Sequence, residues 1–203
     1  DPADYVAFAA ELDANGGAST VATRKKLAAK VFRRTAAYDA AISAWLTART
    51  EGDAFPERLP LSFELGGTLR YGENPHQKAA FYGIGEPSPS LAGSKQLGGK
   101  ELSYNNILDA DGALVLALEF EQTSCVLGEH NNRCGAAVAA TLERAFALAL
   151  AGDPVSAFGG ILATNRTFDV ATAQAIVQSG TFLEVIVAPH VEPAAVAALQ
   201  QAK

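Results

Sequence analysis

Residues 158–188 read FGGILATNRTFDVATAQAIVQSGTFLEVIVA, and this stretch decides the fold class. Phe158–Ala163 and Phe182–Ala188 contain short apolar runs that are typical of buried strands. Between them, Asp169 has the side chain of a helix cap, and we expect its helix to reach about Gln178. Strand–helix–strand order is the unit from which sheets with crossover helices are built. The stretch therefore predicts an α/β layer structure.

The same alternation continues on both sides of this stretch. Apolar residues recur at helical spacing in some segments, and short β-rich runs separate them. Alternating apolar residues at positions 61, 63 and 65 indicate a half-buried strand that pairs with residues 79–82. The other expected elements are a loop at Gly83–Gly93, a helix near Tyr104–Glu121, a strand at Thr123–Leu127, a polar loop at Gly128–Gly135, a helix near Leu142–Leu150 and a helix at Pro193–Ala202.

The first 50 residues have a different pattern, which predicts helices without strands. Apolar residues at helical spacing stop at Gly16-Gly17, and Thr20 is a plausible cap for the helix that follows. Glu51–Pro60 contains two prolines and is predicted to be a linker. We therefore expect a helical segment over residues 1–55 and an α/β domain over residues 56–203.

Composition narrows the classes of function. The 203 residues are 49% hydrophobic and 19% charged, which is typical of a globular protein. A net charge of −6 and the lack of a basic block argue against nucleic acid as the main partner. No apolar stretch approaches the length of a membrane span, and no signal peptide is visible, so we expect a cytoplasmic protein. The chain begins at Asp1 and contains no Met, which favours a piece of a longer protein.

The sequence offers little support for a metal or for ATP. Cys125 and Cys134 are the two cysteines, and we expect both to be reduced thiols. Glu129, His130 and Cys134 are close in sequence but do not form a recognised ligand pattern, so no metal is expected. Gly98-Gly99-Lys100 lacks the spacing of a phosphate-binding P-loop.

Residues 69–77, LRYGENPHQ, are the most informative candidate for a site. Arg70, Tyr71 and His76 flank a Gly and a Pro that favour an irregular backbone. The planar fork of an Arg side chain can donate two parallel hydrogen bonds to a phosphate. From the residues alone, either a phosphate site or a solvated turn explains the string.

Three further polar clusters fall at expected loops or helix starts, where ligands bind in α/β sheets. Helix capping alone explains Ser103–Asn106, and a tight turn explains the glycines of Asp153–Gly160 equally well. His130, in the expected loop after a buried strand, is a candidate general base, with an ordinary polar loop as the alternative. We expect five residues to converge on one cleft: Arg70, Tyr71, Asn106, His130 and Gly159.

These strings resemble motifs of the bifunctional purine-biosynthesis family that combines AICAR transformylase with IMP cyclohydrolase. Asp1–Tyr5, Thr23–Ala28 and Thr35–Asp39 are similar to the closing helices of the cyclohydrolase domain. The resemblance to successive transformylase motifs rests on Leu69–Gln77, Ser103–Ala110, the His130 loop, Asp153–Gly160 and Phe182–Pro189. It implies that residues 1–55 close the cyclohydrolase domain and that residues 56–203 are the first half of the transformylase domain. It also implies a cytidine-deaminase-like layered sheet without zinc, in an intertwined homodimer.

The resemblance further implies an activity and a role for individual residues. The family transfers a formyl group from 10-formyltetrahydrofolate to the 5-amino group of AICAR, so AICAR and folate are the expected small-molecule partners. His130 would be the general base for the amine. The implied nucleotide-binding residues are Arg70 and Tyr71 with His76 supporting their loop, Asn106 at the carboxamide, Phe158 and Gly159 at the base, and Glu184 as an acidic contact.

One position departs from the family pattern. The family has a Lys directly before the His, and this chain has Glu129; the usual Pro of the same loop is Arg133. A carboxylate opposes the oxyanion of the tetrahedral intermediate, which needs positive charge or donors, although Arg133 could replace the cation. Glu129 therefore favours an alternative function as a non-catalytic nucleotide-binding or dimerisation module, with a metal hydrolase as a more distant candidate. Because we expect a piece of a dimeric protein, we also expect self-association or a large exposed apolar surface.

Overall fold

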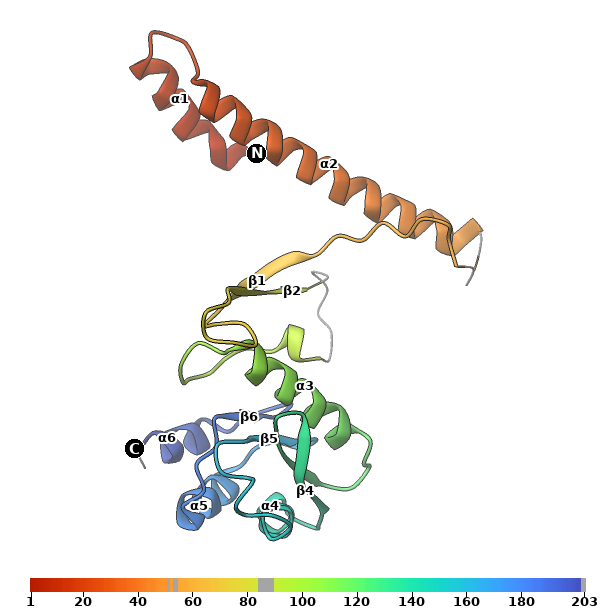
Figure 1. Cartoon of the computed structure of the whole chain (residues 1–203), viewed down its shortest axis with the longest axis vertical. Helices are drawn as coiled ribbons and strands as arrows, with labels where there is room; N and C mark the ends of the chain where they lie inside the picture. The colour runs from red at the N-terminus through yellow and green to blue at the C-terminus, as the bar shows by residue number, and fades with distance from the viewer. Residues whose placement is uncertain (51, 53–54, 84–89, 202–203) are drawn as a thin grey trace. The chain divides into compact units, whose positions relative to one another are not determined.

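The computed structural model describes residues 1–50, 52, 55–83 and 90–201 and contains two compact units, Asp1–Phe63 and Glu64–Lys203 (Figure 1). The units divide after Phe63, whereas the sequence placed a domain boundary after residue 55. The assignment of these parts to the two enzyme domains stays a prediction. Part of the expected linker, at residues 51, 53 and 54, and most of the expected loop, at residues 84–89, lie outside the described residues.

The N-terminal unit is helical, as predicted. A short 3₁₀ turn, η1 (Pro2–Asp4), leads into α1 (Tyr5–Ala14), and α2 (Val21–Thr50) follows. The chain reverses between these helices at two glycines with positive φ angles, 62° and 85°, a conformation that costs glycine little. The hydroxyl of Thr20 accepts a hydrogen bond from the backbone N–H of Thr23 at 3.1 Å. The predicted cap therefore starts α2.

The second unit begins with an antiparallel ribbon of β1 (Glu64–Leu69) and β2 (Ala79–Gly83). The predicted partner is confirmed, but the first strand starts at Glu64 rather than at position 61. The expectation of a half-buried strand is wrong for this chain. Leu65 and Tyr82 face each other across the ribbon, and they are 59% and 55% exposed. A 3₁₀ turn, η2 (Leu91–Gly93), lies between this ribbon and the next helix.

A four-stranded mixed sheet in the order β4-β3-β5-β6 forms the centre of the second unit. β3 runs antiparallel to both β4 and β5, whereas β5 and β6 are parallel. The parallel pair is the one predicted from the strand–helix–strand stretch. The strand bounds are β3 (Ser124–Glu129), β4 (Asn132–Val138), β5 (Ile161–Thr164) and β6 (Val185–Val187).

Helices cover both faces of this sheet (Figure 1). α3 (Tyr104–Leu118) packs on one face, where Val126 and Ala163 contribute to its contact. α4 (Leu142–Leu150) and α5 (Val170–Ser179) lie on the other face, and α6 (Pro193–Gln201) packs against α5. Asp169 caps α5 as predicted, because its Oδ1 accepts from the backbone N–H of Thr172 at 2.8 Å. The unit is therefore a mixed α/β structure with flanking helices, and a helical segment precedes it.

Two of the expected loops and strands are placed differently by the structure. The predicted loop Gly128–Gly135 is a β-hairpin: β3 continues to Glu129, His130 and Asn131 form the turn, and β4 begins at Asn132. The polar side chains of this hairpin are exposed at the end of the sheet. Because they break the alternation of apolar and polar residues, the sequence did not indicate strands here. The strand expected from Phe158 starts only at Ile161.

Among the described residues, no helix is both long and apolar enough to cross a membrane.

Candidate functional site

The predicted site residues of the α/β unit lie around one end of the central sheet. Glu129 ends β3, while Gly159 precedes β5 and Glu184 precedes β6. Because β3 runs antiparallel to β5, its carboxyl end lies beside the amino ends of β5 and β6. The rule that ligands bind at the carboxyl ends of parallel strands therefore does not apply at this edge, because β3, which ends there, is antiparallel to both of its neighbours.

The LRYGENPHQ segment is tied to the start of α3. The backbone N–H of Arg70 donates to the carbonyl of Leu102 at 2.9 Å, and the N–H of Tyr104 donates to the carbonyl of Tyr71 at 3.1 Å. The Asn105 side chain adds a hydrogen bond to the carbonyl of Glu73 at 3.2 Å. These bonds connect the candidate phosphate-binding loop to the first turn of the helix.

The loop itself is closed by local hydrogen bonds. The N–H of Gly72 donates to the carbonyl of Gln77 at 3.0 Å, and a Cβ on Gly72 would lie 2.9 Å from the Cβ of Gln77. The Arg70 guanidinium lies 4.8 Å from the centroid of the Tyr71 ring and donates to its hydroxyl at 3.2 Å. Arg70 and His76 are exposed. The loop therefore presents a cation and a phenol together to solvent.

Asn106 has two roles in the structure. Its backbone N–H and side-chain oxygen form a capping box with Ser103, so the capping interpretation of this motif is correct. Its Nδ2 also donates to Oε2 of Glu184 at 2.6 Å. Asn106 is only 8% exposed, and this bond joins α3 to the segment before β6.

The segments before β5 and β6 are joined in the same way. The N–H of Gly159 donates to the carbonyl of Phe182 at 2.8 Å, and the N–H of Glu184 donates to the carbonyl of Gly160 at 2.9 Å. Phe158 is 61% exposed, and its ring centroid lies 5.9 Å from that of Phe182. Gly159 has a φ of 87°, which favours glycine at this position.

Asp109 is the residue of this region that sequence reasoning missed. It lies one turn after Asn106 on α3 and is 8% exposed. Its carboxylate accepts hydrogen bonds from the backbone N–H groups of His130 and Asn131, at 2.9 and 2.6 Å. The available signal was an acidic residue three positions after Asn106, on the helix face that also carries Ala110, Ala113 and Ala117.

The His130 side chain projects from the hairpin turn. It is 80% exposed, and its Nε2 lies 3.8 Å from Oε1 of Glu129. The same Glu129 oxygen is 3.8 Å from the position that a Cβ on Gly159 would occupy. The carboxylate that departs from the family pattern therefore lies between the candidate base and the glycine before β5.

Arg133 leaves the hairpin towards different neighbours. It pairs with Gly128 across a β-bulge, and its guanidinium lies 2.7 Å from where a Cβ on Gly112 of α3 would be. Arg133 is thus packed against α3 rather than directed to the carboxylate of Glu129.

The Glu129 carboxylate also affects the Cys134 thiol. Burial is the larger cause of the raised pKa of that thiol, and the charge of Glu129 raises it further.

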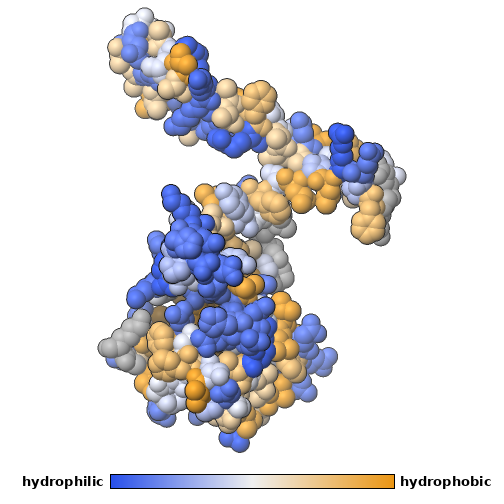
Figure 2. Space-filling model, viewed as in Figure 1, coloured by the Kyte–Doolittle hydropathy of each residue, from blue (hydrophilic) through white to orange (hydrophobic). Residues whose placement is uncertain are grey.

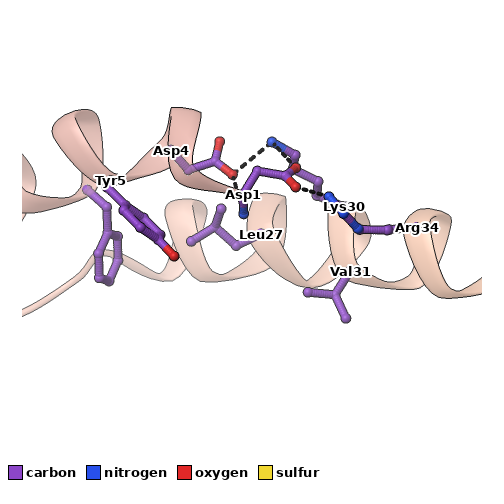
Figure 3. Close-up of a pocket in the computed structure, with 8 residues that line it drawn as sticks. Asp1, Asp4, Tyr5, Leu27, Lys30, Val31 and Arg34 are labelled. Atoms are coloured by element: carbon purple, nitrogen blue, oxygen red, sulfur yellow. Dashed lines mark hydrogen bonds and ion pairs between the residues drawn. The ribbon is translucent and has the colours of Figure 1, made fainter.

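Two pockets lie in the helical unit. One is lined by residues of η1, α1 and α2, including an ion-pair cluster in which Lys30 Nζ lies 2.7 Å from Asp4 Oδ2 and Arg34 pairs with Asp1 (Figure 3). The Lys30 contact lowers the pKa of Asp4. The other is a shallow apolar surface on α2 at Tyr38, Ala41, Ile42, Trp45 and Leu46. Within the described part of the chain, no three His, Cys, Asp or Glu residues are grouped to hold a metal ion.

Comparison with known proteins identifies the family. The whole chain, residues 1–203, matches the family described as AICARFT/IMPCHase bienzyme. The bifunctional purine biosynthesis protein PurH of Myxococcus xanthus is 52% identical over 206 residues, which cover 100% of this chain and 39% of that protein. The PurH protein of Cereibacter sphaeroides is 50% identical over 192 residues, 93% of this chain and 36% of the relative. The PurH protein of Shouchella clausii is 52% identical over 204 residues, again 100% of this chain and 39% of the relative.

The chain thus spans about two fifths of the length of these relatives. A match over every residue of the chain, together with identity near one half to several relatives, is decisive for the family. The chain belongs to the AICARFT/IMPCHase bienzyme family.

Proposed function

We propose that this chain carries part of the AICAR transformylase site of a bifunctional protein of de novo purine biosynthesis. The longer protein would transfer the formyl group of 10-formyltetrahydrofolate to the 5-amino group of AICAR and would then cyclise the product, FAICAR, to IMP. Residues 56–203 would be the first half of a transformylase domain with a cytidine-deaminase-like sheet. Residues 1–55 would close the cyclohydrolase domain, and the protein would work as a homodimer.

The observation that carries this proposal is the gathering of three predicted segments by the first two turns of α3. The Arg70 loop bonds to the residues that open the helix, Asn106 bonds to Glu184, and Asp109 bonds to the His130 turn. Segments separated widely in sequence thereby share one hydrogen-bonded support. Such support is what a binding site needs if its side chains are to be held in place before the ligand arrives.

The proposed chemistry assigns a role to each side chain. Arg70 would bind the nucleotide phosphate and Tyr71 would contact the nucleotide. Asn106 would meet the carboxamide region, and Phe158 with Gly159 would frame the base. His76 would support the phosphate loop, and Glu184 would be an acidic contact.

The transfer step itself requires removal of a proton. The amine nitrogen of AICAR forms a bond to the formyl carbon, and the imidazole of His130 takes the proton that the nitrogen loses. The tetrahedral intermediate then collapses: the bond from the formyl carbon to the folate nitrogen breaks, and that nitrogen leaves with the proton that the His130 imidazolium gives back. An anionic oxygen on this intermediate is stabilised by donors or by positive charge, and Glu129 supplies neither.

Glu129 therefore supports a second candidate function. A nucleotide-binding or dimerisation module of the same fold would keep the Arg70 loop and the support on α3 but would have no need of a cation beside His130. The two candidates differ in catalysis and agree in nucleotide binding, so both can be tested in one protein.

In the test, residues 1–203 of this chain replace the matching segment of the full-length Myxococcus xanthus protein. We expect FAICAR formation to be measurable and to fall by at least about a hundredfold in His130→Ala, because a general base contributes about 10²–10⁴ in rate. His190→Ala is the matched control, since His190 is also exposed but follows the opposite end of β6. If the chimeric protein without further substitutions binds AICAR but does not turn it over, the non-catalytic module is established instead.

A further inference from the structure

The turn that carries His130 has an unusual backbone. His130 and Asn131 are the two non-glycine residues with positive φ in the described chain, at 49° and 59°. This combination is typical of a two-residue hairpin turn whose twist matches that of the strands. Asn and His enter the left-handed region more readily than most other non-glycine side chains, but two successive residues there still carry a conformational cost. Contacts from outside the turn therefore help to hold this conformation.

Asp109 supplies those contacts. One carboxylate oxygen accepts from the N–H of His130 at 2.9 Å, and the other accepts from the N–H of Asn131 at 2.6 Å. Hydrogen bonds to an ionised group are stronger than bonds between neutral groups. Two bonds from one side chain to successive peptide groups fix the orientation of both peptides. They consequently fix the direction in which the Cα–Cβ bond of His130 leaves the turn.

The packing around the turn supports the same arrangement. Gly112 follows Asp109 by three residues on α3, and a Cβ there would lie 3.1 Å from the Asn131 side-chain oxygen and 2.7 Å from the Arg133 guanidinium. The missing side chain lets the hairpin approach the helix. Asp109 is 8% exposed, so water has little access to replace its hydrogen bonds if they are lost.

We propose that Asp109 is the positioning residue for His130, holding the turn in its left-handed conformation so that the imidazole is aimed at the amine to be formylated. The catalytic part rests on the proposed function, whereas the control of the turn does not. Asp109 acts through His130 and does not contact the reacting atoms. An Asn at this position would present an NH₂ group to one of the two N–H donors, so one bond would be replaced by a repulsive contact.

The first measurement is amide hydrogen exchange by NMR on the 203-residue chain. In Asp109→Asn, the amides of His130 and Asn131 should exchange about tenfold to a hundredfold faster, as expected when a hydrogen bond to a charged group is lost. Asp111→Asn is the matched control, because Asp111 lies on the same helix and is exposed. Unchanged protection of both turn amides in Asp109→Asn would overturn the assignment of Asp109 to the turn.

The second measurement uses the same variants in the full-length Myxococcus xanthus protein that carries residues 1–203. Asp109→Asn should lower kcat for formyl transfer by at least about tenfold, because misplacing a reacting group by about an ångström can cost up to a hundredfold. The KM for AICAR should change by less than about threefold, since the phosphate-binding loop is untouched. Asp109→Glu keeps both acceptor oxygens and should fall between the wild type and Asp109→Asn in both measurements, which covers the case in which the Asn variant folds poorly.

The outcomes separate the two proposals. Faster exchange of the turn amides with an unchanged kcat would show a purely structural contact and would overturn the positioning role. Faster exchange of the turn amides together with a higher KM for AICAR, instead of a lower kcat, would overturn the positioning role as well. If the full-length Myxococcus xanthus protein carrying the unmodified residues 1–203 shows no formyl transfer, the proposed catalytic function is overturned. The hydrogen-exchange rates of the turn amides would still decide whether Asp109 controls the turn.

Discussion

The helical unit and the α/β unit differ in how completely they bury their large apolar side chains. Large apolar side chains of α2 are exposed, with Phe32 at 73%, Tyr38 at 68% and Trp45 at 56%, whereas in the α/β unit Phe146 is 2% exposed and Phe168 is fully buried. Figure 2 shows hydrophobic residues on the surface of the helical segment. The α/β unit therefore has a core of its own, whereas α2 carries apolar surface that its own unit leaves open to solvent.

The expected exposed apolar surface is therefore present in the described residues. Self-association remains a prediction. The comparison between the units can be tested by removing the same chemical group from each.

The largest effect is expected from truncating a buried aromatic ring. Phe146→Ala should lower the free energy of unfolding of the α/β unit by about 3–5 kcal/mol, because a large side chain in a packed core leaves a cavity. Phe32→Ala, which removes the same group from an exposed position on α2, should change stability by less than about 0.5 kcal/mol. Urea unfolding followed by circular dichroism measures both. Similar losses for the two variants would contradict the division into a packed and an open unit.

A smaller loss is expected from adding a methyl group at the contact of β4 with α4. A Cβ on Gly135 would lie 1.9 Å from the carbonyl oxygen of Ala149, which is a backbone atom and cannot rotate away. Gly135→Ala should therefore cost about 1–3 kcal/mol or more in the same unfolding experiment. Gly67→Ala is the control, because a Cβ there meets nothing within 4 Å. A neutral Gly135→Ala would show that this layer is less tightly packed than the structure indicates.

The smallest effect concerns the turn of the helical unit and depends on pH. Hydrogen bonds from Thr23 and then Thr20 lower the pKa of Glu11 below its ordinary value of 4.5. A lowered pKa in the folded state means that this contact stabilises the turn fully above the ordinary pKa and is lost as the pH falls through the folded value. The protection factors of the Thr20 and Thr23 amides, which correct for the slower intrinsic exchange at low pH, should accordingly fall on acidification. In Glu11→Gln this acid-dependent loss of protection should disappear, whereas Asp13→Asn should retain it.

Local chemistry made much of the fold predictable. The strand–helix–strand stretch yielded the parallel pair β5 and β6, and Asp169 and Thr20 were recognisable as caps because their side chains have the right acceptors at the right spacing. The hairpin at His130 was missed because its strand residues are polar and small, so period-two alternation is weak there. Which residues support one another across the fold depends on long-range contacts. Asp109 could be read as an unusual residue in a helix, but its bonds to a turn about 20 residues later required the structure.

The candidate site was predictable only in outline. The Arg70, Asn106 and His130 motifs stand out because such side chains do not build cores, and the structure joins their segments through α3. The direction of Arg133 was not predictable. The β-bulge between Leu127 and Gly128 and the absence of a side chain at Gly112 place its guanidinium against the helix.

The most direct test of the account is the charge at Glu129. In the full-length Myxococcus xanthus protein carrying residues 1–203, Glu129→Lys should raise kcat for FAICAR formation by about a hundredfold or more, because one donor to an oxyanion contributes about 10²–10³ and a carboxylate opposes it. AICAR affinity should change much less, since the proposed role of Arg70 is to bind the phosphate in the ground state. Glu119→Lys, the same charge change at the exposed end of α3, should leave the rate unaltered. If the Glu129 protein already turns over at a rate that the Lys variant does not exceed, the proposed role of this position is wrong.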